Sequence, residues 1–468
     1  MTPKSWVAAG AVLAVFAVML FSPAIFNDGD TWWHVKAGEW MLDHRIVPHR
    51  DPFAGESPPR PWVPHEWLAE ILLALSFRAA GWAGVALLTA FAGALALGLL
   101  ADRLARDLDP IALTVALALV FLLWSGGLLA RPHVLALPVV VAWTTGLLAA
   151  RERGEAPSWW LIPLLVVWAN LHGGFAFGIA LAGFFALEAL VETGSGRIVT
   201  VFRDWLLFGL GCVAAALLTP HGIDGLLFPF QLLAMSSLSQ IGEWQPVTFT
   251  GLVPIEIVLL VVIATLLRLP VRLSATRIVL LLLLLHLALH QSRHGMLLAV
   301  VGGLLLAPAI GQAAGRATSV KRPAWPRQAI LAVALLALAG SRLAWPPVRG
   351  NDPTAPVAAL AAVPRDVRAT PVLNAYAFGG YLIWSGIPPW IDSRADMYGD
   401  EGMFAYARLI SPDANYLEAT LARDRIGWTI FAPGEPLVRV LDAMPGWRRL
   451  HADEVAVVHI RDRPLAPK

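Results

Sequence analysis

Residues 27–67 read NDGDTWWHVKAGEWMLDHRIVPHRDPFAGESPPRPWVPHEW, and they follow directly on the first apolar run of the chain. This segment combines two neighbouring acids, Asp28 and Asp30, with His34, His65 and Glu66, and it is rich in tryptophan. A shorter and blander connection would suffice to join two membrane spans. The segment therefore predicts a reaction or binding site at a membrane surface.

The rest of the composition is that of a membrane protein. Of the 468 residues, 57% are hydrophobic and 15% are charged. Apolar runs of roughly 17–22 residues recur along the chain, and that is about the length that crosses ~30 Å of hydrocarbon. The net charge of +2 gives no electrostatic basis for binding nucleic acid. The single cysteine, Cys212, cannot form an internal disulfide.

The apolar runs predict an all-α polytopic membrane bundle with about eleven transmembrane helices. The run at 66–80 is expected to be a re-entrant or surface helix, because counting it as a crossing breaks the alternation of charge between loops. A cleavable signal peptide is the other interpretation of the first run, which is long for one. The predicted spans are residues 5–26, 82–102, 110–129, 133–150, 158–171, 174–193, 204–219, 253–269, 276–291, 295–312 and 327–345.

Lysine and arginine divide the connecting loops into two sets. The basic set, which includes Arg151, Arg153, Arg316, Lys321 and Arg322, is expected to be cytoplasmic. This assignment puts the N-terminus in the cytoplasm and the C-terminal region on the outer, periplasmic side, and the expected location is a bacterial inner membrane. The histidines fall on or near the outer side. Either outer loops simply tolerate histidine, or these loops converge on one outward-facing cavity.

The sequence predicts two domains. Residues 1–345 form the transmembrane domain with its long first outer loop, 27–65, and residues 346–468 form a small soluble α/β domain on the outer side. In the second domain the hydropathy drops, and short β-like runs (PVLNAY, YLIW, WTIFA and EVAVVHI) alternate with helical stretches such as 401–410 and 414–424.

Charged residues alternate in the sequence IDSRADMYG of this outer domain. An extended chain would place Asp392, Arg394 and Asp396 on one face of a strand. A satisfied row of ion pairs is the favoured interpretation, and a contact with an acceptor is the other.

A helix is expected at residues 30–44. Its periodicity places Asp30 and His34 on the side of the tryptophans, whereas Glu39 and Asp43 lie on the opposite side with Lys36. An acid away from water is costly unless it has a partner or a task. Asp30 is therefore a candidate catalytic group; a helix N-cap is the other interpretation, and the two are compatible.

Further acids follow at the start of the next helix. Glu66 and Glu70 are one turn apart and His65 precedes them. Glu66 is a second candidate catalytic acid. The alternative is an interfacial helix with one hydrated face.

The sequence HLALHQSRHG predicts a site for an anionic headgroup. His286, His290, Arg293 and His294 form one stripe if the helix persists, and ionisable residues on one face of such a helix point into the bundle or a water-filled cavity. Arginine matches phosphate by bidentate bonding. An ordinary helix end with interfacial cations is the alternative interpretation.

Other polar residues on the outer side are weaker candidates. Arg131 is a second phosphate ligand or a snorkelling cation, and His172, His221 and Glu243 are candidates to line a substrate cavity together with His34 and His65. The sequence has no GxxxxGK[ST], HExxH, GxSxG or CxxC motif. ATP-driven transport, common zinc proteolysis and α/β-hydrolase chemistry are therefore not supported.

The chain resembles the GT-C superfamily of membrane glycosyltransferases. The resemblance rests on one span, a long outer loop that opens with the Asp motif NDGD (27–30), surface helices, about ten further spans and an outer C-terminal domain. The stretches DTWWHVKAGEWMLDHRIVPHRDPF, WVPHEWLAE and FGGYLIWSGIPPWIDSRADMYGD (378–400) are similar to a group of bacterial membrane proteins placed near that superfamily.

The resemblance implies transfer of a sugar from a polyprenyl-phosphate-linked donor to a glycan, lipid or protein acceptor of the cell envelope. The first-loop Asp of the family acts as base or helps to bind a divalent metal such as Mg or Mn, and that role maps to Asp30 or Asp28, with His34 as a further possible ligand. Glu66 and Glu243 are the stand-ins for a second acid, so metal use stays open.

The departing lipid phosphate needs cations that stabilise its negative charge. The candidates are Arg293, Arg131, His290 and His294. A lipid-carrier flippase and a non-catalytic envelope assembly protein are the alternative functions; the flippase predicts polar residues through the full depth of the bilayer, whereas here they concentrate on one side.

Overall fold

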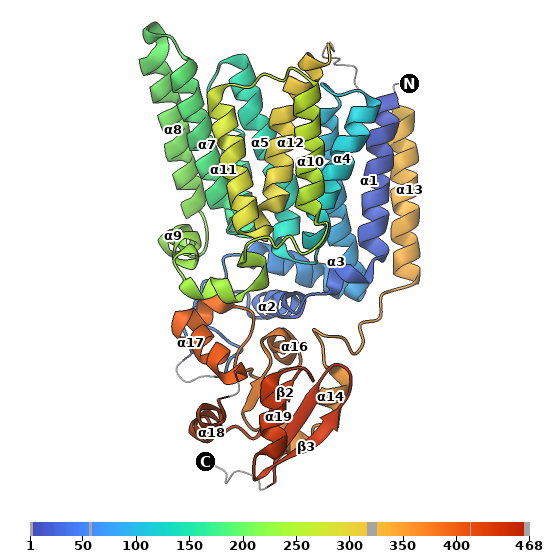
Figure 1. The fold of residues 1–468 in the computed structure, drawn as a ribbon, viewed down its shortest axis with the longest axis vertical. Coiled ribbons are helices and arrows are strands. Elements are labelled where there is room, and N and C mark those ends of the chain that lie inside the picture. Colours follow the sequence, from blue (N-terminus) through green and yellow to red (C-terminus); the bar gives the residue numbers. More distant parts are fainter. Residues whose placement is uncertain (1–2, 56–58, 316–324, 412, 463–468) are drawn as a thin grey trace. The chain divides into compact units, whose positions relative to one another are not determined.

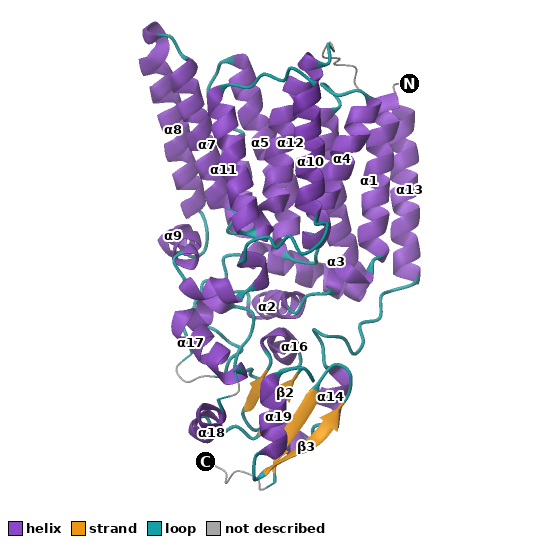
Figure 2. Ribbon diagram, in the orientation of Figure 1, coloured by secondary structure: helices purple, strands orange, loops and turns teal. Residues whose placement is uncertain are grey.

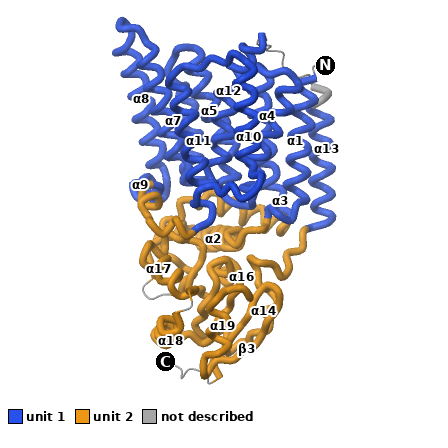
Figure 3. Tube along the Cα trace, viewed as in Figure 1, with its two compact units in different colours: residues 1–25, 83–229, 241–346 blue, residues 26–82, 230–240, 347–468 orange. Residues whose placement is uncertain are grey.

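The computed structural model describes residues 3–55, 59–315, 325–411 and 413–462, and it is mostly helical with one small sheet (Figures 1 and 2). The predicted cytoplasmic residues Arg316, Lys321 and Arg322 lie outside the described residues. The chain divides into two compact units (Figure 3). Unit 1 comprises residues 1–25, 83–229 and 241–346, and unit 2 comprises residues 26–82, 230–240 and 347–468.

Unit 1 is the helical bundle that the sequence predicts. Among the described residues, seven helices are long and apolar enough to cross a membrane, and the chain is an integral membrane protein. Each predicted span forms a helix, although α6, α10 and α11 have only 11, 15 and 16 residues. The helices of unit 1 are α1 (Pro3–Phe21), α4 (Pro110–Trp124), α5 (Pro132–Arg153), α6 (Leu161–Leu171), α7 (Phe175–Glu192), α8 (Ile198–Leu217), most of α9 (Gly222–Leu233), α10 (Pro254–Arg268), α11 (Ala275–His290), α12 (Gly295–Ala313) and α13 (Trp325–Ala344).

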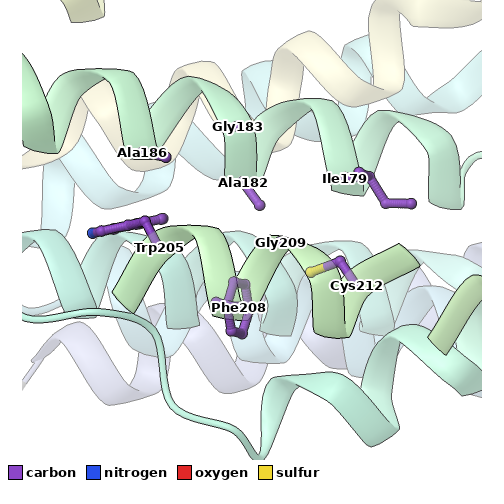
Figure 4. A pocket seen from close by; sticks show the side chains of 8 residues that line it. All are labelled: Ile179, Ala182, Gly183, Ala186, Trp205, Phe208, Gly209 and Cys212. Atoms are coloured by element: carbon purple, nitrogen blue, oxygen red, sulfur yellow. The ribbon is translucent and has the colours of Figure 1, made fainter. Parts of the chain in front are cut away.

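Small residues leave an apolar cavity between α7 and α8 (Figure 4). Its volume is about 120 Å³, and it contains no charged lining residue. Cys212 is buried beside it, which agrees with the apolar surroundings that the sequence gives this thiol. The lining residues are Ile179, Ala182, Gly183, Ala186, Trp205, Phe208, Gly209 and Cys212.

Helix α3 (Trp67–Leu104) is kinked. That residues 66–80 form a re-entrant or surface helix stays a prediction. The kink lies at Ala80 and Gly81, and Gly81 has φ 57° and ψ −145°. A glycine populates this conformation readily because it has no Cβ. The residues before the kink belong to unit 2, and nearly all residues after it belong to unit 1.

Unit 2 contains a four-stranded sheet of order β1-β2-β4-β3. Strands β1 (Val372–Asn374) and β2 (Trp428–Phe431) are parallel, whereas β4 (Val457–Arg461) is antiparallel to β2 and to β3 (Trp447–Ala452). The surrounding helices are α2 (Asp30–His44), α14 (Val357–Ala362), α15 (Arg365–Arg368), α16 (Gly379–Trp384), α17 (Ala395–Ile410), α18 (Ala414–Arg423) and α19 (Pro436–Ala443).

One predicted strand is wrong, because YLIW belongs to helix α16. A short apolar run does not distinguish a strand from a buried helix by periodicity. Two glycines begin this helix and let it approach other backbone closely. A Cβ at Gly380 would collide with the carbonyl oxygen of Gly29, directly before α2.

Unit 2 has a core that joins the first loop to the C-terminal segment. Trp33, Ala37 and Met41 from α2, Trp62 from the loop and Ile383 from α16 form one buried cluster. The loop 27–65 is therefore built into the same unit as residues 347–468. The domain boundary at residue 345 stays a prediction.

Candidate functional site

Asp28 and Asp30, the two acids that open the first loop, make different hydrogen bonds at the N-terminus of α2. The Asp28 Oδ1 atom accepts a hydrogen bond from the backbone N–H of Asp30 at 2.8 Å, so Asp28 caps the helix start. Asp30 is the first residue of the helix and is only 7% exposed. Its Oδ1 atom accepts a 3.4 Å hydrogen bond from the indole Nε1 of Trp33. The N-cap is therefore Gly29 rather than Asp30, and Asp28 supplies the side-chain hydrogen bond at this helix start.

The predicted division of α2 into two faces is confirmed. Asp30 and His34 are buried, whereas Asp43 is exposed and Lys36 and Glu39 are partly exposed. The Trp33 ring lies against His34 with ring centroids 3.7 Å apart, and the Trp33 indole also donates to Ser393 Oγ at 3.0 Å. Packing of the tryptophans against residues far along the chain therefore keeps the acid and the imidazole away from water.

His34 lies between two glutamates of the next helix start. Its Nδ1 atom is 3.2 Å from Oε1 of Glu70, and its Nε2 atom is 3.8 Å from Oε2 of Glu66. The other Glu66 oxygen is 3.7 Å from Nε2 of His65. We call Glu70, His34, Glu66 and His65 the acid–histidine cluster. Of its members, Glu70 is the one that the sequence treated only as part of a helix face.

A buried arginine completes this part of unit 2. Arg394 donates from Nη1 to Asp51 Oδ1 at 2.7 Å and from Nη2 to Asp392 Oδ2 at 2.7 Å. The Tyr398 hydroxyl donates to the same Asp392 oxygen at 2.7 Å. Burial opposes ionisation of Asp392, but the Arg394 guanidinium outweighs it and holds the pKa of this carboxyl below its usual range.

The predicted alternation in IDSRADMYG is only partly right. Asp392 and Arg394 do form an ion pair, but residues 391–394 are not a strand, and Asp396 lies in the first turn of α17. Burial raises the pKa of Asp396 to about 6, with Asp392 and Asp51 adding to the effect and Arg394 opposing it. The partnership of Arg394 with Asp51 has no local sequence signal, because it depends on the tertiary fold.

In unit 1, two predicted phosphate ligands share one glutamate. Glu243 Oε2 accepts a hydrogen bond from Nη1 of Arg131 at 3.2 Å, and Glu243 Oε1 is 3.4 Å from Nη1 of Arg293. The Arg293 guanidinium also lies 4.1 Å from the ring centroid of Trp244. Burial opposes ionisation of Glu243, yet Arg131 and Arg293 hold its pKa below the ordinary value. We call Arg131, Glu243 and Arg293 the arginine–glutamate cluster.

The predicted stripe of cations is interrupted after His290. Helix α11 ends at His290, Gln291 is extended, and a 3-10 turn, Ser292–His294, leads into α12. His290 is exposed beside His286, whereas the Nε2 atom of His294 contacts the Gln291 side-chain oxygen at 2.9 Å. The helix cannot continue as the spacing assumed, because residues 291–294 form a turn between two antiparallel segments (Figure 1).

The remaining cavity candidates are also in unit 1. His172 accepts a hydrogen bond at Nδ1 from the backbone N–H of Gly174 at 3.0 Å, and its ring is 6.2 Å from that of His133. His221 is 7% exposed and lies at the start of α9. Whether these residues and the acid–histidine cluster line one cavity stays a prediction.

The divalent metal that the GT-C resemblance implies does not fit the donor set as it stands. Among the described residues, no group of three or more His, Cys, Asp or Glu side chains is placed to hold a metal ion. Asp28 uses one oxygen as a helix cap and His34 faces two glutamates. We therefore derive no step through a metal.

Comparison with known proteins gives structural relatives. No protein-family model matches the chain, and no curated protein matches it. The apo crystal structure of the oligosaccharyltransferase of Archaeoglobus fulgidus is similar, with a TM-score of 0.52 and 12% identity over 90% of this chain and 69% of that chain. The chain therefore shares the fold of that structure and, as its sequence predicts, is a helical membrane bundle with a small α/β part.

Proposed function

We propose that this protein is a membrane glycosyltransferase that moves a sugar from a polyprenyl-phosphate-linked donor to an acceptor on the outer side of a bacterial inner membrane. The observation that carries the proposal is Asp30, a buried acid at the start of α2, in a loop that is fixed by Arg394 and the shared core. Its fold-level support is the similarity to an oligosaccharyltransferase.

The chemistry needs a base for the acceptor hydroxyl. The hydroxyl oxygen forms a bond to the anomeric carbon, the bond from that carbon to the phosphate oxygen breaks, and the hydroxyl proton passes to the base. We assign this role to Asp30, because Asp28 is engaged as a helix cap. Glu66, with His34 and His65 on either side, is the second acid of the proposed site.

The leaving group is a lipid phosphate and needs cations. Preorganised cations stabilise the charge that develops on a leaving oxygen, and Arg131 and Arg293 are two guanidinium groups held around one carboxylate. A carboxylate and a phosphate accept the same bidentate pattern. We assign the donor phosphate to these two arginines.

The test uses purified protein in proteoliposomes with a panel of polyprenyl-phosphate hexoses. An envelope extract is added as the source of acceptors. Release of polyprenyl phosphate is measured, because it reports transfer even when the acceptor is not identified. Asp30→Asn is expected to lower release by about 10²–10⁴-fold, the typical contribution of a general base. Asp43→Asn, at an exposed position of the same helix, is the matched control and should keep full activity.

Two outcomes would count against the proposal. Full release by Asp30→Asn removes this residue from the mechanism. No release by the unaltered protein with any donor, together with movement of labelled lipid between leaflets, would instead favour a lipid-carrier flippase.

A further inference from the structure

The acid–histidine cluster is a chain in which each inner member uses two different atoms. Glu70 Oε1 faces His34 Nδ1 at 3.2 Å, His34 Nε2 faces Glu66 Oε2 at 3.8 Å, and Glu66 Oε1 faces His65 Nε2 at 3.7 Å. An imidazole can take a proton at one nitrogen and release another from the second. A carboxyl can do the same with its two oxygens. The order of atoms is therefore that of a proton relay.

Exposure changes in one direction along this chain. The side chains of Glu70 and His34 are each 1% exposed, that of Glu66 is 14% exposed, and that of His65 is 21% exposed. The Oε2 atom of Glu70 is buried and has no hydrogen-bond partner in the described part of the chain. A buried carboxyl without full hydrogen bonding favours its neutral, protonated form. One end of the chain is thus suited to hold a proton, and the other end reaches water.

We propose that Glu70, His34, Glu66 and His65 form a proton relay between a buried carboxyl and the solvent. Its use rests on the proposed function: the relay exchanges protons between the solvent and the buried part of unit 2 that holds Asp30. Asp30 and His34 are four residues apart on α2, so their side chains are neighbours on one face. His34 takes a proton from Glu70 at Nδ1 and passes one from Nε2 to Glu66, which passes one to His65 and water.

The relay requires the Glu66 carboxyl group to rotate between two imidazoles. Its contacts of 3.8 Å and 3.7 Å to the two imidazoles exceed hydrogen-bond length. The carboxyl must rotate toward one imidazole at a time, first to accept a proton from His34 and then to give one to His65. Glu70 exchanges a proton with His34 at the Nδ1 atom.

Other charges act on the buried end. Arg394 favours the ionised form of Glu70, whereas Glu66 and Asp396 oppose it. Trp33 covers the face of the His34 ring. The protonation of Glu70 therefore reflects Arg394 and Asp396 from the C-terminal segment as well as its helical neighbour.

Infrared spectroscopy of the full-length protein without donor or acceptor tests the relay. The carbonyl band of a protonated Glu70 is identified by its loss in Glu70→Gln, and its shift is then followed after transfer into D₂O. The unaltered protein should exchange this proton rapidly. Glu66→Gln and His65→Gln should lose the rapid phase, whereas Glu39→Gln, at a partly exposed acid on α2, should retain it.

The outcomes separate this proposal from the proposed function. If no carbonyl band disappears in Glu70→Gln, or if Glu66→Gln and His65→Gln exchange as fast as Glu39→Gln, the relay is overturned whatever the transfer activity. If exchange slows as expected but no donor supports sugar transfer, the relay stands and the proposed function fails. Glu66→Gln and His65→Gln are both included, so that misfolding of one still leaves a decisive comparison.

Discussion

Arg394 and Asp51 form a bidentate ion pair although 343 positions separate them in the sequence. The two hydrogen bonds measure 2.7 and 3.3 Å, and both side chains are 1% exposed. Asp51 also accepts hydrogen bonds from the backbone N–H groups of Phe53 and Ala54. The pair therefore fixes the first loop to the C-terminal segment within unit 2.

Removal of Arg394 should destabilise unit 2 strongly. Arg394→Gln leaves Asp51 and Asp392 as buried carboxylates without their counterion, and breaking such a pair costs about 3–5 kcal/mol. Denaturant unfolding in detergent, followed by tryptophan fluorescence, measures the loss. Arg408→Gln is the control, because Arg408 is 60% exposed in its pair with Asp413 and such pairs contribute about 0–1 kcal/mol. An equal loss in both variants would contradict the role of burial.

The stability of unit 2 should depend on pH through Asp396. Burial raises the pKa of Asp396 from 3.8 to about 6, so the folded state favours the protonated acid. The stabilising contribution is complete below about pH 4 and is lost as the pH rises through about 6. Asp396→Asn should therefore match the unaltered protein at low pH and exceed it by roughly 2–3 kcal/mol above pH 7. A variant that is less stable above pH 7 would show that the ionised acid has a favourable partner.

Gly380→Ala should separate α16 from the start of α2. The added Cβ would collide with the Gly29 carbonyl oxygen, and forcing atoms into a packed interior costs about 1–3 kcal/mol. Limited proteolysis of unit 2 and its thermal unfolding provide the measurement. Gly434→Ala is the control, because a Cβ there meets nothing within 4 Å. Equal protease resistance of the two variants would show that the contact adjusts without cost.

Glu243 should limit the affinity for anionic lipid. Its carboxylate occupies Arg131 and Arg293, so Glu243→Gln should bind a fluorescent polyprenyl phosphate about tenfold more tightly, whereas Arg293→Gln should bind it about tenfold more weakly, as expected for one charged hydrogen bond. Binding is measured by titration in nanodiscs. If Glu243→Gln instead weakens binding, Glu243 positions the arginines rather than competing with the phosphate.

The sequence was most informative where a pattern is local. Hydropathy located the helices of the bundle, since a long apolar run has few alternatives in a membrane. Periodicity placed Asp30 and His34 on the buried side of α2. It failed for YLIW, because a four-residue apolar run fits a strand and a buried helix equally well. It also failed for the stripe that ends in His294, because the spacing of those residues does not reveal the turn that interrupts the helix.

The sequence by itself determined the class of the protein, a helical membrane bundle with a polar first loop and an α/β segment, because burial of apolar runs in lipid depends on composition alone. Only the tertiary structure decided the partners: Arg394 with Asp51, His34 with Glu70 and Glu66, and Glu243 with two arginines. The energy of an ion pair depends on a distance of a few ångströms in space and not on the separation of the two residues along the chain. The packing that brings such groups together has no local signature in the residues themselves.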